Sequence, residues 1–220
     1  MLRPALAALI VALPLAAHAL CTSDDVPQPT LLMERFTSAD CLACWRDRAT
    51  PQGAPGTLAL DWIVPGLKAE GAALASDASD DAMERLDYLR RPTPKRADVV
   101  STRREGDPLT LRLAHGAAFN DYIGTSMQLR DAGDEVWHAW LLLVEKVPAG
   151  QDGSPIPRNI VRKVFRPESW ARVGRGRGEL AETRSMQVPR DARPERLRLV
   201  GVLQDGRGRI RAISQTECRE

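Results

Sequence analysis

The sequence predicts an α/β fold, with a βαβ core in the N-terminal third and an antiparallel β-rich C-terminal elaboration. Between residues 31 and 91 the apolar residues follow the order of a strand, a helix, a strand and a second helix. This order is typical of parallel strands joined by helical crossovers. From residue 96 onward the pattern changes to alternating strands separated by turn residues. We therefore expect residues 20–105 to contain the core and residues 106–220 to form the β-rich region.

The segment 1–19 precedes this fold and has the features of a cleaved signal peptide. A basic start at Arg3 is followed by an apolar run over residues 6–16 and by the Ala17-His18-Ala19 cleavage signal. The run is too short to cross a hydrocarbon layer about 30 Å thick. We expect a periplasmic or secreted protein, whose cysteines lie in a compartment where disulfides form and persist.

The elements of the N-terminal third are bounded by residues that end them. Leu58, Leu60 and Trp62 alternate along one face of a predicted strand, and Pro65 ends it. The second helix has acids in its first turns and arginines in its last, as the helix dipole favours. The expected elements are a strand at 31–38, a helix that begins at Cys41 and is closed by Pro51, a strand at 57–64, and a helix at 76–91 that ends before Pro92.

The pattern of the C-terminal region predicts a series of strands. Residues 136–147 are almost continuously apolar, which predicts a central strand covered on both faces. Asp205-Gly206 is a hairpin signal, and residues 148–157 are expected to form a long surface loop. The glycine-rich stretch 174–178 lacks the preceding strand and following helix of a nucleotide site. The other expected strands are residues 109–113, 123–129, 159–165, 197–204 and 210–214.

Composition excludes several classes of function. The 220 residues include 31 basic and 29 acidic side chains, and their interspersed charges argue against nucleic-acid binding. No segment after the leader is apolar enough to predict stable membrane insertion. The chain has no nucleophile elbow, phosphate loop or metalloprotease motif, and we expect no cofactor. The sequence leaves the oligomeric state open.

The strongest chemical signal is the CxxC pair, Cys41 and Cys44, which follows a predicted buried strand. A spacing of three residues on a helix puts both sulfurs on one face, near enough to bond. The first sulfur then lies among unpaired backbone N–H groups, which stabilise a thiolate. We therefore predict Cys41 as the attacking sulfur of thiol–disulfide exchange and Cys44 as the resolving sulfur.

Two other readings of the pair remain open. It is alternatively a static local disulfide, which exported proteins also contain. It is alternatively half of a zinc or copper site, but the ligands of the other half are missing, so we predict no metal. Cys21 and Cys218 are isolated in the sequence, and His115 and His138 lie in the middle of predicted strands.

The order strand, CxxC, helix, strand resembles the thioredoxin superfamily. The string Glu34 to Trp45, "ERFTSADCLACW", is similar to an exported bacterial thioredoxin-like family of unknown function. Thr93-Pro94 resembles the pair that supplies the superfamily's cis-proline, which implies that Pro94 shapes a substrate groove. Residues 158–162 and the final hairpin are similar to segments of the same family, although the chain has Asp61 to Val64 where family members carry a histidine.

The other two cysteines, Cys21 and Cys218, lie near opposite ends of the mature chain. If Cys41 pairs with Cys44, these two are left to each other, and we predict a structural disulfide that joins the ends of the fold. Closing so long a loop would stabilise the fold by roughly 4–5 kcal/mol in the chain-entropy model. The alternative is that one of them is a second exchange partner of Cys41.

The remaining polar candidates have structural interpretations. We expect His115 and His138 to be hydrogen-bonded histidines of the core or of a sheet edge, rather than catalytic bases. Arg158, Arg162 and Arg166 are expected to form a solvated strand face, with an anionic ligand site as the alternative.

The sequence as a whole predicts an exported thiol–disulfide oxidoreductase-like protein. Its expected partners are the thiols or disulfides of other exported proteins. The alternative is a non-enzymatic binding module on a thioredoxin-like scaffold, in which the CxxC pair is a structural disulfide.

Overall fold

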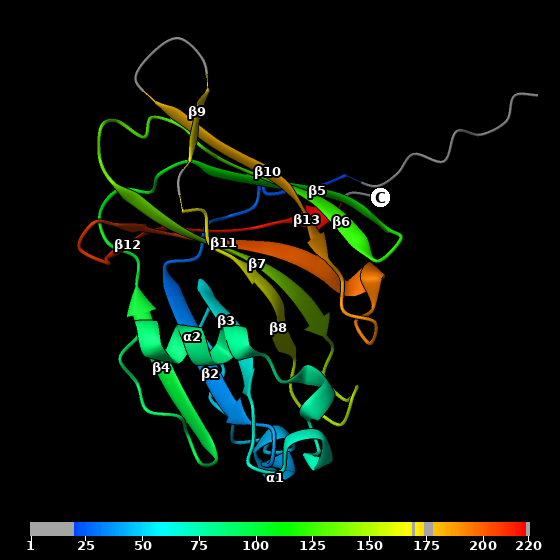
Figure 1. Cartoon of the computed structure of the whole chain (residues 1–220). Coiled ribbons are helices and arrows are strands. Elements are labelled where there is room, and N and C mark those ends of the chain that lie inside the picture. Colours follow the sequence, from blue (N-terminus) through cyan, green and yellow to red (C-terminus); the bar gives the residue numbers. More distant parts are fainter. Residues whose placement is uncertain (1–19, 169, 174–177, 219–220) are drawn as a thin grey trace, which may run out of the picture.

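The computed structural model describes residues 20–168, 170–173 and 178–218, and these residues fold mainly as β-strands (Figure 1). The strands form two sheets, one of seven strands and one of six. The leader and residues 174–177 of the glycine-rich stretch lie outside the described residues. No helix within the described ranges is long and apolar enough to cross a membrane.

The seven-stranded sheet is mixed. Strand β2 runs parallel to β3, and β3 runs parallel to β8, whereas the other neighbours are antiparallel. The predicted parallel pairing of the first two long strands is therefore confirmed. In spatial order the strands are β12 (Ile210–Gln215), β11 (Leu197–Asp205), β7 (Trp137–Val147), β8 (Arg158–Phe165), β3 (Thr57–Val64), β2 (Leu31–Ser38) and β4 (Ala97–Arg103).

The six-stranded sheet is antiparallel in every pairing. Its edge is formed by two short strands that carry Cys21 and Cys218. In spatial order the strands are β13 (Glu217–Cys218), β1 (Cys21–Thr22), β5 (Leu111–Phe119), β6 (Tyr122–Leu129), β10 (Glu179–Gln187) and β9 (Ala171–Val173). Only part of the predicted antiparallel elaboration lies in this sheet, because β7, β8, β11 and β12 of the C-terminal region belong to the seven-stranded sheet.

The helices of the described chain are short. Helix α2 begins after Ser79, whose hydroxyl accepts a hydrogen bond from the backbone N–H of Asp81, and it covers one face of the seven-stranded sheet. Helix α1 has only one turn. The helical elements are α1 (Leu42–Trp45), α2 (Asp80–Tyr88) and the 3-10 turns η1 (Ala69–Gly71), η2 (Ala75–Asp77) and η3 (Pro194–Arg196).

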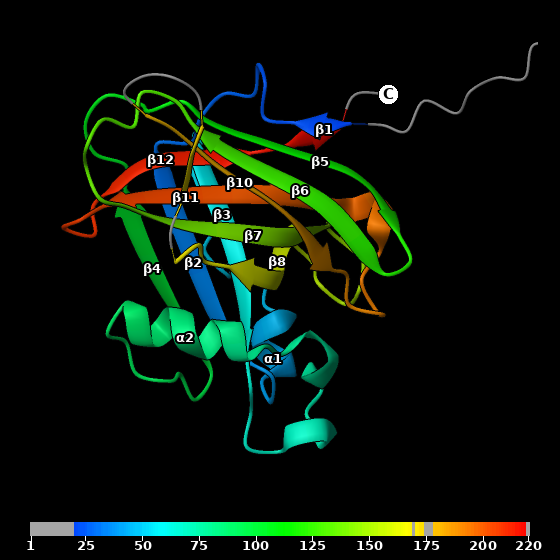
Figure 2. The same cartoon turned by 45° about the horizontal axis from the view of Figure 1, so that its top comes forward.

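Strand β7 explains how the layers pack. Leu141 and Leu143 face a core shared with the six-stranded sheet, whereas Trp140 and Leu142 face a second core beneath α2. Both faces of β7 are therefore buried, which confirms the central strand predicted from its continuous apolar sequence. Figure 2 shows the six-stranded sheet on one side of the larger sheet and α2 on the other.

The predicted α/β class is correct only in part. The parallel strands are present, but the described chain is β-rich, and a thioredoxin fold is not shown. The helix expected between Cys41 and Pro51 stops after Trp45, and α2 is shorter than the predicted 76–91. The boundary expected at residue 105 falls between strands that belong to one sheet, because β2, β3 and β4 pair in the same sheet as β7, β8, β11 and β12.

Candidate functional site: the CxxC cleft

The CxxC pair lies where β2 ends and α1 begins, and Cys41 and Cys44 are joined by a disulfide. Cys41 is the N-cap of α1. Its carbonyl accepts a hydrogen bond from the backbone N–H of Cys44 at 3.0 Å, and its Sγ accepts from the same N–H at 3.3 Å. One backbone donor thus contacts the sulfur of the first cysteine, as the sequence predicted for a helix start.

The two cysteines differ in their access to solvent. Cys41 is only 7% exposed, whereas Cys44 is partly exposed and lines a cleft with a volume of about 320 Å³. The sequence predicted the opposite order, with Cys41 as the accessible sulfur. The cleft is bounded by the end of β2 (Arg35 and Thr37), the loop after α1 (residues 47–51) and the start of β4 (residues 96–99).

Asp40 precedes the pair but is engaged with a different loop. Its carboxylate accepts hydrogen bonds from the backbone N–H groups of Leu67, at 2.7 Å, and Lys68, at 3.4 Å. A Cβ at Gly66 would lie 2.5 Å from the Asp40 carboxyl carbon, so this approach requires glycine. The contact joins the backbone just before Cys41 to the loop that follows β3.

A buried cluster of three charged residues, Arg35, Asp61 and Arg158, lies beside the cleft. All three are at most 3% exposed. The Asp61 carboxylate accepts hydrogen bonds from Arg35, at 2.6 Å, from Arg158, at 3.0 Å, and from the backbone N–H of Asn159, at 2.8 Å. The cluster carries one more positive than negative charge, because a single carboxylate faces two guanidinium groups.

This charged cluster supports the chain that follows Cys44. Arg158 donates to the carbonyl of Trp45 at 2.8 Å and stacks over the Trp45 ring at 4.6 Å. Arg35 donates to the carbonyl of Pro51 at 3.2 Å, and its Nε is buried without a partner among the described residues. Burial lowers the pKa of the Arg158 guanidinium, and the nearby Asp61 carboxylate opposes that shift. The backbone after the cysteines is therefore anchored to β2, β3 and β8.

A second buried ion pair lies on the opposite face of β2. Arg85 of α2 donates two hydrogen bonds of 2.7 Å to Glu34, and the indole N–H of Trp62 donates to the same carboxylate at 3.1 Å. Glu34 and Arg35 are neighbours, so their side chains point to opposite faces of the strand. Glu34 thus connects β2 to α2 on one face of the strand, and Arg35 connects β2 to the segment after α1 on the other face.

The arginines of β8 do not form the predicted solvated face. Arg158 is buried in the charged cluster, and the side chain of Arg162, 7% exposed, lies against Glu145 and Asp77, to which it donates hydrogen bonds. Only Arg166 is exposed, and it stacks over Trp140 at 4.3 Å. The prediction was wrong for the first two because β8 is an interior strand of the sheet, where a guanidinium is buried only with a carboxylate partner.

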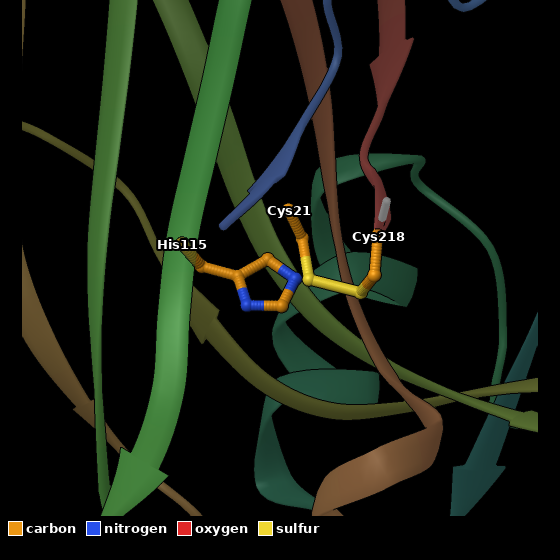
Figure 3. Close-up of side chains that lie close together, drawn as sticks. All are labelled: Cys21, His115 and Cys218. Atoms are coloured by element: carbon orange, nitrogen blue, oxygen red, sulfur yellow. A yellow bond between two sulfur atoms is a disulfide. The ribbon is translucent and has the colours of Figure 1, made fainter. Parts of the chain in front are cut away.

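The predicted disulfide between Cys21 and Cys218 is present, and it joins adjacent strands β1 and β13. His115 of β5 lies directly opposite Cys21, and Figure 3 shows its ring turned toward the sulfurs. One ring nitrogen of His115 and the two sulfurs lie within 4.8 Å of one another. Sulfurs bonded to each other are not thiolates, so this trio does not offer a thiolate metal site in the oxidised protein.

His115 is buried, as predicted for a hydrogen-bonded core histidine. Its Nδ1 lies 2.9 Å from the carbonyl of Gly116, which fixes Nδ1 as the protonated nitrogen. Nε2 has no hydrogen-bond partner within the described part of the chain. Burial lowers the pKa of the imidazole below its ordinary 6.5, so the ring is neutral at pH 7.

Pro94 and His138 lie apart from the CxxC cleft. Pro94 is partly buried in the segment between α2 and β4, and the peptide bond before it is trans, where the resemblance implies cis. It is not among the residues that line the cleft, whereas Pro51 is. His138 is exposed and lines a separate cavity of about 400 Å³ with Glu84 and Arg166.

The roles of Arg35, Asp61 and Arg158 beside the cysteines were not predicted from the sequence. One signal was available, because Asp61 interrupts an otherwise apolar strand and a buried carboxylate requires a cationic partner. The identity of that partner was not visible, since Arg158 is 97 residues away. Comparison of the chain with protein-family models, with curated proteins and with solved structures finds no match.

Proposed function

We propose that this protein is a thiol–disulfide oxidoreductase-like protein that uses the Cys41–Cys44 disulfide for exchange. The observation that carries the proposal is the cleft beside this disulfide, which the partly exposed Cys44 lines. Exchange requires that an incoming sulfur reach one sulfur of the pair. Such a cleft meets that requirement, whereas a disulfide buried on all sides does not.

The proposed partners are thiols or disulfides of other exported proteins. The signal-like leader supports a periplasmic or secreted location, where such partners occur. The position of the CxxC pair, between the parallel strands β2 and β3, supports a distant thioredoxin-like arrangement of this segment. The cleft walls combine backbone and side chains of both charge signs, including Arg96 and Asp98.

A binding module with a structural disulfide is the second candidate. It is favoured by the burial of Cys41 and by the single turn of α1, because thiols activated by a helix lie at the start of longer helices and are exposed. In that case the disulfide would serve only to fix the helical turn α1, which carries Trp45. The two candidates differ in one measurable quantity, the reduction potential of the pair.

A redox titration of the purified protein against dithiol buffers tests the proposal. We expect the Cys41–Cys44 disulfide to equilibrate above about −300 mV, because structural disulfides of secreted proteins lie below that value. The Cys21→Ser/Cys218→Ser variant isolates the signal of the CxxC pair, and the Cys41→Ser/Cys44→Ser variant shows the other disulfide alone. A potential for the pair below this limit would favour the structural disulfide and sink the oxidoreductase proposal.

A further inference from the structure

We propose that Cys44, and not Cys41, is the sulfur that exchanges with the partner, and that Cys41 is the leaving and resolving sulfur. This inference rests on the proposed function and names the order of its steps. It reverses the order expected when the first cysteine of a helix-capping pair is the accessible one.

Access to the cleft carries the inference. Cys44 lines the cleft and is partly exposed, whereas Cys41 is 7% exposed and does not line it. The backbone of Cys41 is also held in place, because its N–H donates to the carbonyl of Ser38 and its carbonyl accepts from Cys44 and Trp45. A sulfur that attacks in line with the S–S bond therefore approaches Cys44 from the cleft.

The hydrogen bonding favours the same order. The backbone N–H of Cys44 lies 3.3 Å from the Cys41 Sγ. When the disulfide opens, this donor faces a developing thiolate on Cys41, and a hydrogen bond to a charged sulfur is stronger than one to a disulfide sulfur. A stabilised thiolate is the better leaving group. Cys41 is thus suited to leave, and Cys44 is placed to be attacked.

The exchange balances without any further reactant. A partner thiolate attacks the Cys44 sulfur, the S–S bond to Cys41 breaks, and its electron pair stays on Cys41 as a thiolate. A second partner thiolate then attacks the partner sulfur of the mixed disulfide and releases the Cys44 thiolate. The partner dithiol is oxidised by two electrons and the pair is reduced by two. The reverse sequence begins with attack by the Cys44 thiolate on a partner disulfide.

Variants of the full protein that each lack one cysteine of the CxxC pair test which sulfur exchanges first. Reduced Cys41→Ser, which keeps Cys44, is mixed with oxidised glutathione, and reduced Cys44→Ser is treated identically. We expect a mixed disulfide to form at least about tenfold faster on Cys44 than on Cys41, because exchange rates follow the access of the thiolate. Mass spectrometry measures the adduct, and circular dichroism checks that both variants are folded.

A second measurement uses the unmodified protein. After reduction of the pair under native conditions, a brief exposure to iodoacetamide is followed by fragmentation of the peptide that contains both cysteines. Preferential alkylation of Cys44 supports the proposed order. Preferential reaction of Cys41, here or in the variants, overturns that order and leaves the proposed function standing. If neither variant forms an adduct, the proposed function fails, and the order fails with it.

A matched pair of substitutions on β4 tests the approach through the cleft. Ala97 lines the cleft, whereas Ser101 is exposed on the same strand face and does not line it. Ala97→Trp should slow adduct formation on Cys44 several-fold, and Ser101→Trp should leave the rate unchanged. Equal rates in both variants would show that the incoming sulfur does not use this cleft.

Discussion

At the scale of single residues, the main finding is that one carboxylate organises the surroundings of the cysteine pair. Asp61 contacts two arginines, one from β2 and one from β8, and these arginines contact the backbone at Trp45 and Pro51. Burial of each arginine carries a desolvation penalty, and the Asp61 carboxylate offsets part of that penalty. We therefore expect Asp61 to help fix the backbone between Trp45 and Pro51, which follows Cys44.

The Asp61→Asn substitution tests this role. It leaves two buried guanidinium groups without a counter-charge, and we expect the free energy of unfolding to fall by about 3–5 kcal/mol. Chemical denaturation followed by circular dichroism measures the change. Asp98→Asn is the matched control, because Asp98 pairs with Arg91 at the surface and an exposed pair contributes only about 0–1 kcal/mol. Similar losses in the two variants would show that the cluster is not important for stability.

At the scale of elements, strands β2 and β3 have the bounds that the sequence predicts, residue for residue. Their apolar runs end at Ser38 and Val64, next to the turn residues that stop them. Strand β7 is also close to its expected range, since its apolar sequence requires cover on both faces. These strands were predictable because most of their residues are apolar and recur in the pattern of buried strands.

Other elements were not visible in the sequence. Strand β10 is rich in polar residues, and it is a strand because it pairs along its length with β6. Strands β1 and β13 have two residues each, too few for any periodicity, and they pair beside the disulfide that joins them. The spacing of the CxxC pair predicted that its sulfurs could bond, but the cleft that Cys44 lines is completed by residues 96–99, which no local pattern reveals.

The contact between β11 and β5 gives a prediction for the packing of the two sheets. A Cβ at Gly201 would lie 2.9 Å from a methyl carbon of Leu111 and 3.1 Å from one of Leu113. The Gly201→Val substitution overpacks this interface, and we expect a loss of about 1–3 kcal/mol in the free energy of unfolding. Denaturant titration of the variant and the unmodified protein measures this loss.

Gly124 provides the matched control for that substitution. It is exposed on β6, and a Cβ there would have no neighbour within 4 Å. Gly124→Val should therefore change the free energy of unfolding by no more than about 0.5 kcal/mol. Equal free energies of unfolding for Gly201→Val and Gly124→Val would show that the two sheets leave room for a side chain at Gly201.

At the scale of the whole molecule, the two disulfides have different structural contexts. Cys21 and Cys218 are 197 residues apart in sequence, whereas Cys41 and Cys44 are 3 apart. The Cys21–Cys218 disulfide closes a loop that contains nearly the whole described chain, whereas the Cys41–Cys44 disulfide closes a single turn. In the chain-entropy model, the stabilisation grows with the length of the closed loop.

Removal of each disulfide tests this difference. We expect Cys21→Ser/Cys218→Ser to lower the free energy of unfolding by roughly 4–5 kcal/mol, and Cys41→Ser/Cys44→Ser by about 2 kcal/mol. Thermal unfolding of both double variants measures the order of the two losses. A larger loss in the CxxC variant would mean that the pair is chiefly a structural element.

The pairing of β1 with β13 also affects how the protein is oriented when it is immobilised through a terminal tag. Both strands lie at the opposite end of the molecule from α1 in the two orientations of Figures 1 and 2. A tether attached beyond either strand would thus leave from the same side of the molecule, away from α1. Capture experiments with an immobilised protein are therefore insensitive to which terminus carries the tag.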